Sequence, residues 1–277
     1  MELARQTTRI ESSVSESRSA EQRLDAFTKV LLHQRYLAAR NSAFLQPKDP
    51  EKWPTATAIQ RPIDAVYSEM ERTTPEAFRH WRQLLSVNSE AYVGFPLHSC
   101  SVVGHPAGQY FQYFVYPYLD GRVLDIGCGP QPVPVYLQDY PLPLIYGIDP
   151  ISDASGHPFV FETGIAEDLP WPDCTFKVVI AATSLDHVLL PDRAFSEVSR
   201  VLAKGGLFLV WVAFIENAPP YEPTNPDIRP VDQFHLFHFS KQSFENSVSK
   251  FFVIDHVCRL TVDIEHYFYA LRPRGTS

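Results

Sequence analysis

The sequence predicts an α/β fold built on a mostly parallel, doubly wound sheet, and three observations support this prediction. In the second half of the chain, short apolar runs rich in β-branched or aromatic residues alternate with helical patterns. The first of these runs enters a glycine turn, as in folds that bind ligands at the carboxyl ends of parallel strands. The chain has 277 residues, 45% of them hydrophobic and 20% charged, so it can bury a large core.

The first part of the chain is predicted to be helical. Residues 1–19 show no apolar period and are expected to form a loose tail. Helices are expected over residues 21–40, 75–87 and 107–118, because apolar side chains recur there at helical spacing. In the first of these helices the predicted buried face consists of Leu24, Phe27, Val30, Leu31 and Leu37.

The second part of the chain supplies the predicted sheet. A helix over residues 191–204 separates two of the strands, and Ser240 caps another that ends near Lys250. A proline-rich insertion lies near 214–239. The expected strands are 122–126, 144–148, 159–162, 176–182, 206–213, 252–260 and 262–271.

The chain is accordingly divided into an N-terminal helical lid, residues 1–105, and a sheet-containing core, residues 106–277.

Charge and composition exclude several classes of protein. With 24 Lys and Arg against 32 Asp and Glu, the net charge is −8, which argues against a nucleic-acid-binding protein. The first residues lack the apolar stretch of a signal peptide, and no apolar run is long enough to span a bilayer. The four cysteines show no metal-binding or disulfide-framework spacing. We therefore expect a cytoplasmic protein without a membrane partner, and leave a homodimer open.

A ligand site is predicted where the first strand ends. Gly127 and Gly129 frame a tight turn in which a side chain would block close approach of a ligand to the backbone. Asp149 lies 20 residues beyond Gly129, at the end of the next strand, where a carboxylate accepts hydrogen bonds from a ribose diol. Pro132 interrupts the glycine pattern of a dinucleotide site, so a nucleoside other than a nicotinamide dinucleotide is favoured.

Four segments between residues 123 and 213 resemble, in order, the motifs of class I S-adenosylmethionine-dependent methyltransferases of type 11. They are Val123–Pro130, Tyr146–Pro150, Gly164–Asp173, and the pair Leu185–Val188 and Arg200–Gly206. The resemblance implies a Rossmann-like sheet of about seven strands, the last one antiparallel, and S-adenosylmethionine as the cofactor.

The resemblance also implies which residues contact this cofactor. The turn formed by Gly127, Cys128 and Gly129 would meet the methionine part, and Asp125 would orient that turn and the ammonium group. Asp149 would hold the ribose hydroxyls. Other positions near the adenine or the cofactor would be Ala166, Glu167 and Thr183.

A general base is expected after the fourth strand. His187 follows Asp186 at the position that faces the methyl group in this family, and imidazole suits proton removal near neutral pH. Both residues are therefore the catalytic candidates, although a structural role for His187 stays open. Related magnesium-dependent enzymes carry two carboxylates here, and Thr183 replaces one of them, so no metal is expected.

His235 and His238 are candidates for contact with the substrate, or else residues of the loop before Ser240. No added binding domain or basic surface points to a macromolecular acceptor. We expect methyl transfer to a hydroxyl of a small molecule, such as a sugar or a secondary metabolite. Two alternatives stay open: N-methylation of an amino sugar or another small amine, and a non-catalytic protein that binds the nucleoside. The latter is suggested by Gln131, Ile165 and Thr183, which depart from the family pattern.

Overall fold

The computed structural model describes residues 2–45, 48–59, 62–94, 99–152 and 156–275. Within the first helix, side chains are described for residues 21–44.

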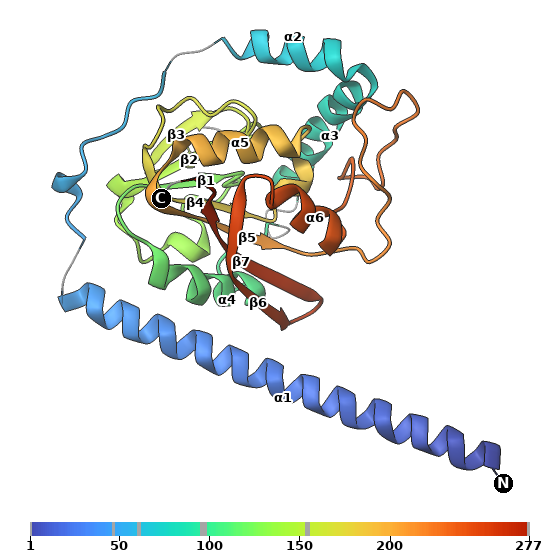
Figure 1. The fold of residues 1–277 in the computed structure, drawn as a ribbon. Helices are drawn as coiled ribbons and strands as arrows, with labels where there is room; N and C mark the ends of the chain where they lie inside the picture. Colours follow the sequence, from blue (N-terminus) through green and yellow to red (C-terminus); the bar gives the residue numbers. More distant parts are fainter. Residues whose placement is uncertain (1, 46–47, 60–61, 95–98, 153–155, 276–277) are drawn as a thin grey trace.

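A seven-stranded sheet forms the centre of the molecule, in the order β3-β2-β1-β4-β5-β7-β6 (Figure 1). Strands β1 to β5 run parallel, and β7 is antiparallel to both of its neighbours. This arrangement confirms the predicted fold class, including the antiparallel last strand. The strands are β1 (Val123–Ile126), β2 (Ile145–Asp149), β3 (Val160–Thr163), β4 (Phe176–Ala182), β5 (Leu202–Val212), β6 (Phe252–Thr261) and β7 (Glu265–Pro273).

Helices cover both faces of the sheet (Figure 1). On one face, α4 (Pro106–Val115) packs its buried Phe111 and Phe114 into a cluster with strand residues such as Phe268. On the other face, α5 (Pro191–Val201) and α6 (Lys241–Val248) share a cluster with Trp81. Burial of aromatic side chains on each side holds the sheet between two apolar layers.

The first helix differs from the prediction at both ends. A continuous α1 (Glu2–Leu45) replaces the expected loose tail. The tail contains Glu, Arg, Gln, Ala and Leu, which favour helix, among its serines and threonines, and extending an existing helix costs far less than starting one. The predicted buried face is also wrong in most of its positions, because Leu24, Phe27, Val30 and Leu31 are exposed. Leu32 and Tyr36 make the contact with the domain instead.

Two further helices precede the sheet. The predicted second helix is present as α3 (Pro75–Gly94), with Phe78, Trp81 and Leu84 buried as expected, but it continues about two turns past Val87. A helix that was not predicted, α2 (Ile63–Thr73), packs against it. In α4, His105 is the N-terminal cap, since its Nδ1 accepts a hydrogen bond from the Gly108 amide.

The connection between β1 and β2 contains no α-helix, only the 3-10 turns Val135–Leu137 and Leu142–Leu144. Four prolines between residues 130 and 141 remove backbone donors that an α-helix would need. The loop between residues 213 and 240, where the proline-rich insertion is predicted, likewise has no helix or strand.

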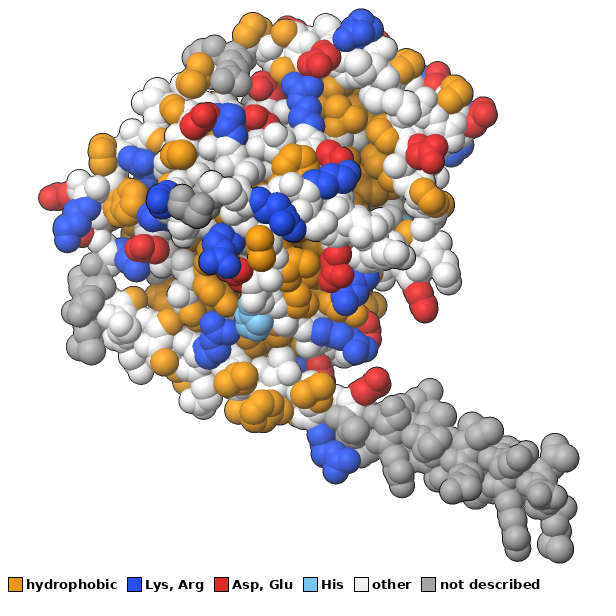
Figure 2. Space-filling view, viewed as in Figure 1, with side chains coloured by type: hydrophobic (Ala, Val, Ile, Leu, Met, Phe, Trp, Pro, Cys, Tyr) orange, Lys and Arg blue, Asp and Glu red, His pale blue; other side chains and the backbone are white. Residues whose placement is uncertain are grey.

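The surface shows charges of both signs. On the face in Figure 2, Lys and Arg side chains are interspersed with Asp and Glu, and apolar side chains lie between them. Within the described part of the chain, no helix combines the length and the apolar character needed to cross a bilayer.

Candidate functional site

A pocket lies where β1, β2 and β4 end, which is the edge of the sheet at which the fold places its ligands. The strands are in register here: Ile126 pairs with Ile148 on one side and with Ala181 on the other. Helix α3 covers the pocket with Trp81 and Tyr92. The space between these residues is about 810 Å³ and includes open solvent at its mouth.

The glycine turn borders this pocket and accepts no side chains. Gly127 and Gly129 have φ of 68° and 69°, a conformation that L-residues rarely adopt. A Cβ on Gly127 would lie 2.4 Å from the Cβ of Ser184. One on Gly129 would lie 3.5 Å from the Ser99 hydroxyl oxygen, in space that both residues border. The turn therefore exposes backbone to the pocket, as the sequence predicts.

Asp149 lines the pocket at the end of β2 and joins two loops. Its Oδ2 accepts a hydrogen bond from the Gly129 amide at 2.9 Å, and its Oδ1 accepts from the amides of Ile151 and Ser152. A carboxylate has about four acceptor sites, so one remains for a ligand hydroxyl. Asp149, which was predicted from its position in the sequence, thus holds the glycine turn and also faces the pocket.

Asp125 and Cys128 lie behind the turn and do not line the pocket. Asp125 is fully buried, and its Oδ2 accepts a hydrogen bond from the Tyr136 hydroxyl at 2.9 Å. Cys128 is also fully buried, against Gly147 of β2. Because both side chains are buried and outside the lining, direct contact of either one with a ligand stays a prediction from the sequence. Their backbone, and the support that Asp125 gives through Tyr136, remain available to the site.

Burial changes the ionisation of Asp125. Desolvation raises its pKa to about 8, and the nearby Asp149 carboxylate acts in the same direction, while the Tyr136 hydrogen bond opposes both. Oδ1 has no hydrogen-bond partner among the described residues. The folded protein therefore keeps a proton on Asp125 over a pH range in which the unfolded chain has lost it.

The variant Asp125→Asn is expected to remove part of the alkaline destabilisation of the protein. Between about pH 4 and pH 8 the folded state binds more protons at this position than the unfolded state, so wild-type stability falls as pH rises. An amide cannot ionise and gives no such slope. Urea unfolding at pH 5 and pH 8.5 measures the change in the free energy of unfolding between these pH values. If the variant loses as much stability as wild type, the prediction is wrong.

The loop after β3 contributes Ala166 and Glu167 to the pocket wall. The Glu167 side chain does not lie free for a ligand, since its Oε1 accepts hydrogen bonds from the amides of Leu189 and Leu190 at 2.7 and 3.0 Å. Desolvation raises the pKa of this buried carboxyl, and these backbone donors counteract it. Glu167 therefore anchors the start of α5, a role that sequence spacing could not reveal. Trp171 is likewise a buried anchor of this loop and not part of the pocket lining.

The segment after β4 forms the opposite wall. Thr183 lines the pocket with a positive φ of 55°, and its amide donates to the Trp211 carbonyl. His187 lines the pocket from the 3-10 turn Leu185–His187, and its carbonyl accepts a hydrogen bond from the Trp81 indole. Desolvation lowers the pKa of His187, which keeps the imidazole neutral at pH 7. Asp186 lies beside it but does not line the pocket.

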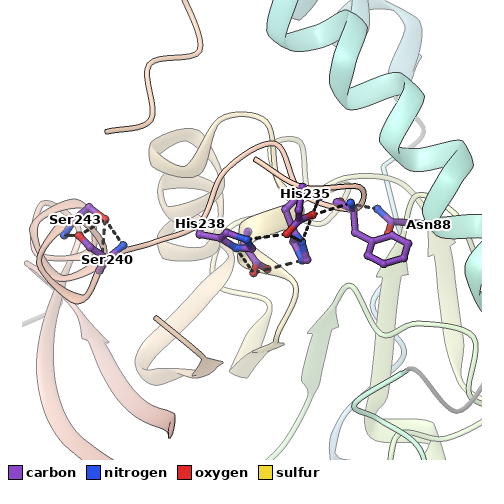
Figure 3. A network of polar contacts seen from close by, with 8 residues as sticks. Asn88, His235, His238, Ser240 and Ser243 are labelled. Atoms are coloured by element: carbon purple, nitrogen blue, oxygen red, sulfur yellow. Dashed lines mark hydrogen bonds and ion pairs between the residues drawn. The ribbon is translucent and has the colours of Figure 1, made fainter. Parts of the chain in front are cut away.

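His235 and His238 lie in the loop after β5, neither on a helix nor in the pocket lining (Figure 3). The His235 ring lies on that of His187, with centroids 4.5 Å apart. Asp232 bridges the pair: one carboxylate oxygen lies 2.9 Å from Nδ1 of His235 and the other 2.9 Å from Nε2 of His238. The two histidines thus reach the site through His187 and Asp186.

Several residues of the site were missed by sequence reasoning. Asp232 has no motif around it and joins the site only because its loop folds back over the strand ends. Helix α3 and the segment after it carry no family motif either, although the apolar face of α3 was visible. The missed lining residues are Trp81, Leu85, Asn88, Tyr92, Ser99, Cys100 and Ser101.

Residues 124–210 match the family model described as a methyltransferase domain. The chain is also 32% identical over 117 residues to an Aspergillus luteorubrus protein named "Probable methyltransferase ltbC". That match covers 34% of this chain and 41% of the relative, so the chain spans less than half the length of the curated relative it matches.

Solved structures resemble the fold at low sequence identity. One is a Pyrococcus horikoshii protein, 21% identical, with 67% of this chain and 99% of that chain covered and a TM-score of 0.49. Another is a Thermotoga maritima protein described as a SAM-dependent methyltransferase and possible histamine N-methyltransferase, also 21% identical. It covers 70% of this chain and 99% of its own, with a TM-score of 0.47.

Proposed function

We propose, from the premise that residues 124–210 form a class I methyltransferase domain with S-adenosylmethionine as its cofactor, that the protein methylates a hydroxyl group of a small molecule. The observation that carries the proposal is the shared pocket of the glycine turn, Asp149 and His187. One space is bordered by all three groups that the reaction needs. The glycine turn supplies backbone for the cofactor, Asp149 a carboxylate for the ribose, and His187 an imidazole for proton removal.

The residues that line the pocket fit the chemistry of the cofactor. Gly127 and Gly129 present backbone to it, and Asp149 offers the remaining acceptor site of its carboxylate to a ribose hydroxyl. Ile148 and Ile165 supply apolar surface for the adenine beside Ala166. S-adenosylmethionine supplies an activated methyl group when bound, so the protein contributes mainly position and alignment.

His187 is proposed to take the proton of the acceptor hydroxyl. It borders the pocket, and Asp186 next to it stabilises the imidazolium that forms. The hydrogen bond from Trp81 to the His187 carbonyl fixes the backbone of this turn against α3. With the ring of His235 packed against it at a tilt of 31°, His187 is restricted to few orientations.

A small acceptor is supported by the enclosing lid. Trp81, Leu85 and Tyr92 on α3 cover the pocket and provide apolar surface for a compact organic molecule. The same wall would also admit an amine, which makes N-methylation the second candidate. A cytoplasmic location, the lid-and-core division and a homodimer stay predictions from the sequence.

Isothermal calorimetry tests the cofactor first. We expect S-adenosylmethionine and its demethylated product to bind one site per chain, and NAD not to bind. Binding of both sulfur nucleosides would justify a screen of hydroxylated and aminated small molecules for formation of the demethylated product. Absence of binding by either nucleoside would contradict the proposal. Binding of both without turnover of any acceptor in the screen would favour the non-catalytic alternative.

A further inference from the structure

Asp186, His187 and His235 bring three donor side chains together at the edge of the pocket. One ligand atom from each lies within 4.8 Å of the other two. Two of these residues follow β4, and the third comes from the distant loop after β5, so only the tertiary structure assembles them. The Asp186 and His235 side chains are 21% and 22% exposed, which leaves a path from solvent.

His235 turns its two ring nitrogens toward two carboxylates. Its Nδ1 lies 2.9 Å from Oδ1 of Asp232. Its Nε2 lies 3.8 Å from Oδ2 of Asp186, which is too far for a hydrogen bond. With the ring neutral and its proton on Nδ1, this nitrogen and this oxygen can both serve as ligands of one cation.

Asp232 acts on this pair of atoms from outside. Besides the His235 ring, its Oδ1 accepts the amides of Phe234 and His235, which fixes the carboxylate. The side chain of Asn88 on α3 donates to the Phe234 carbonyl and holds the same loop (Figure 3). A carboxylate that orients an imidazole through its far nitrogen is the usual support of a metal-binding histidine.

We propose that Asp186, His187 and His235 bind a divalent transition-metal ion, with Asp232 as the orienting partner of His235. Two donors at about 2.1 Å from one ion lie no more than about 4.2 Å apart, so the 3.8 Å separation fits without rearrangement. The third donor atom, on His187, lies within 4.8 Å of the other two and would have to approach them where the separation exceeds about 4.2 Å. Two imidazoles with one carboxylate suit zinc or iron(II) better than magnesium, which prefers oxygen ligands.

The ion would have a place in the reaction, and this part rests on the proposed methyl transfer. Three protein ligands leave coordination positions open, and His187 places them beside the pocket. An acceptor hydroxyl on the ion would lose its proton more readily, as metal-bound water does, and solvent at the partly exposed edge of the site would take that proton. In the loaded protein His187 would be a ligand, and the bound hydroxyl would not need it as a base. The proposal replaces the sequence-based expectation that no metal is bound.

Titration of the full chain, freed of metal by a chelator, with ZnCl₂ tests the site directly. Calorimetry is expected to give one strong site per chain, and CoCl₂ to give the visible absorption of a site with nitrogen ligands. Asp186→Ala and His235→Ala are each expected to weaken zinc binding by about tenfold or more, and Asp232→Asn by about 10-fold to 100-fold. His33→Ala, which removes an exposed imidazole on α1, is the matched control and leaves affinity unchanged.

Thermal melting of each variant establishes that it is folded. If wild-type protein binds neither zinc nor cobalt, or if Asp186→Ala and His235→Ala bind zinc as wild type does, the metal site is wrong and the cluster is a hydrogen-bonded network. The same metal-free sample is titrated with S-adenosylmethionine. Cofactor binding without zinc binding overturns the metal site alone, whereas zinc binding without cofactor binding overturns the proposed function and leaves the ion site standing.

Discussion

His187→Ala is expected to lower the rate of methyl transfer to a hydroxyl acceptor by about 100-fold to 10,000-fold, the usual contribution of a positioned proton acceptor. The imidazole is the side chain that borders the pocket next to Asp186. The substitution keeps the His187 carbonyl, so the hydrogen bond from Trp81 that holds α3 is retained. Turnover is measured as formation of the demethylated cofactor with an acceptor found in the screen.

Two measurements separate chemistry from binding in this variant. S-adenosylmethionine affinity, measured by calorimetry, should stay within a few-fold of wild type, because the cofactor's expected contacts lie on the glycine turn and Asp149. His33→Ala should keep wild-type turnover, since that imidazole lies on α1 against Tyr113. Turnover within threefold of wild type in His187→Ala would show that neither proton removal nor ligation by this ring matters to the reaction.

Asp149→Ala is expected to weaken S-adenosylmethionine binding by about 100-fold or more. A hydrogen bond to a charged group contributes about 1.5–3 kcal/mol, and tenfold in affinity corresponds to about 1.4 kcal/mol, so loss of the ribose contact alone accounts for at least tenfold. The substitution also removes the acceptor of the Gly129 amide, which loosens the glycine turn. Calorimetric titration with S-adenosylmethionine measures both losses together.

Asp149→Asn keeps one of the two loops that Asp149 joins. Its amide oxygen can still accept the amides of Ile151 and Ser152, whereas the NH2 group that replaces Oδ2 is a donor, so the charge and the hydrogen bond from the Gly129 amide are lost. We expect about a tenfold weaker cofactor affinity for this variant. Asp227→Ala, which changes an exposed carboxylate in the proline-rich loop, should bind as wild type does. Wild-type affinity in Asp149→Ala would exclude this carboxylate from the cofactor site.

Much of the sheet could be predicted because its signals are local. Buried parallel strands read as short apolar runs whatever their neighbours are, and Val123–Ile126 and Phe176–Ala182 are such runs. Helix caps are local as well, so the start of α6 at Ser240 was predicted, and its hydroxyl accepts the Ser243 amide. The prediction of the buried face of α1 was wrong because apolar spacing identifies one side of a helix but not which residues on that side contact the domain.

Sequence alone was enough to predict the sheet, the glycine turn and the carboxylate at the end of β2, because each depends on residues adjacent in the chain. The tertiary structure was needed to place the Asp125 and Cys128 side chains behind the turn and to show that Glu167 anchors a loop. It alone brought His235 and Asp232 to Asp186 and His187. The physical reason is that side-chain direction and the path of a 28-residue loop follow from packing across the sheet, which spacing along the chain does not encode.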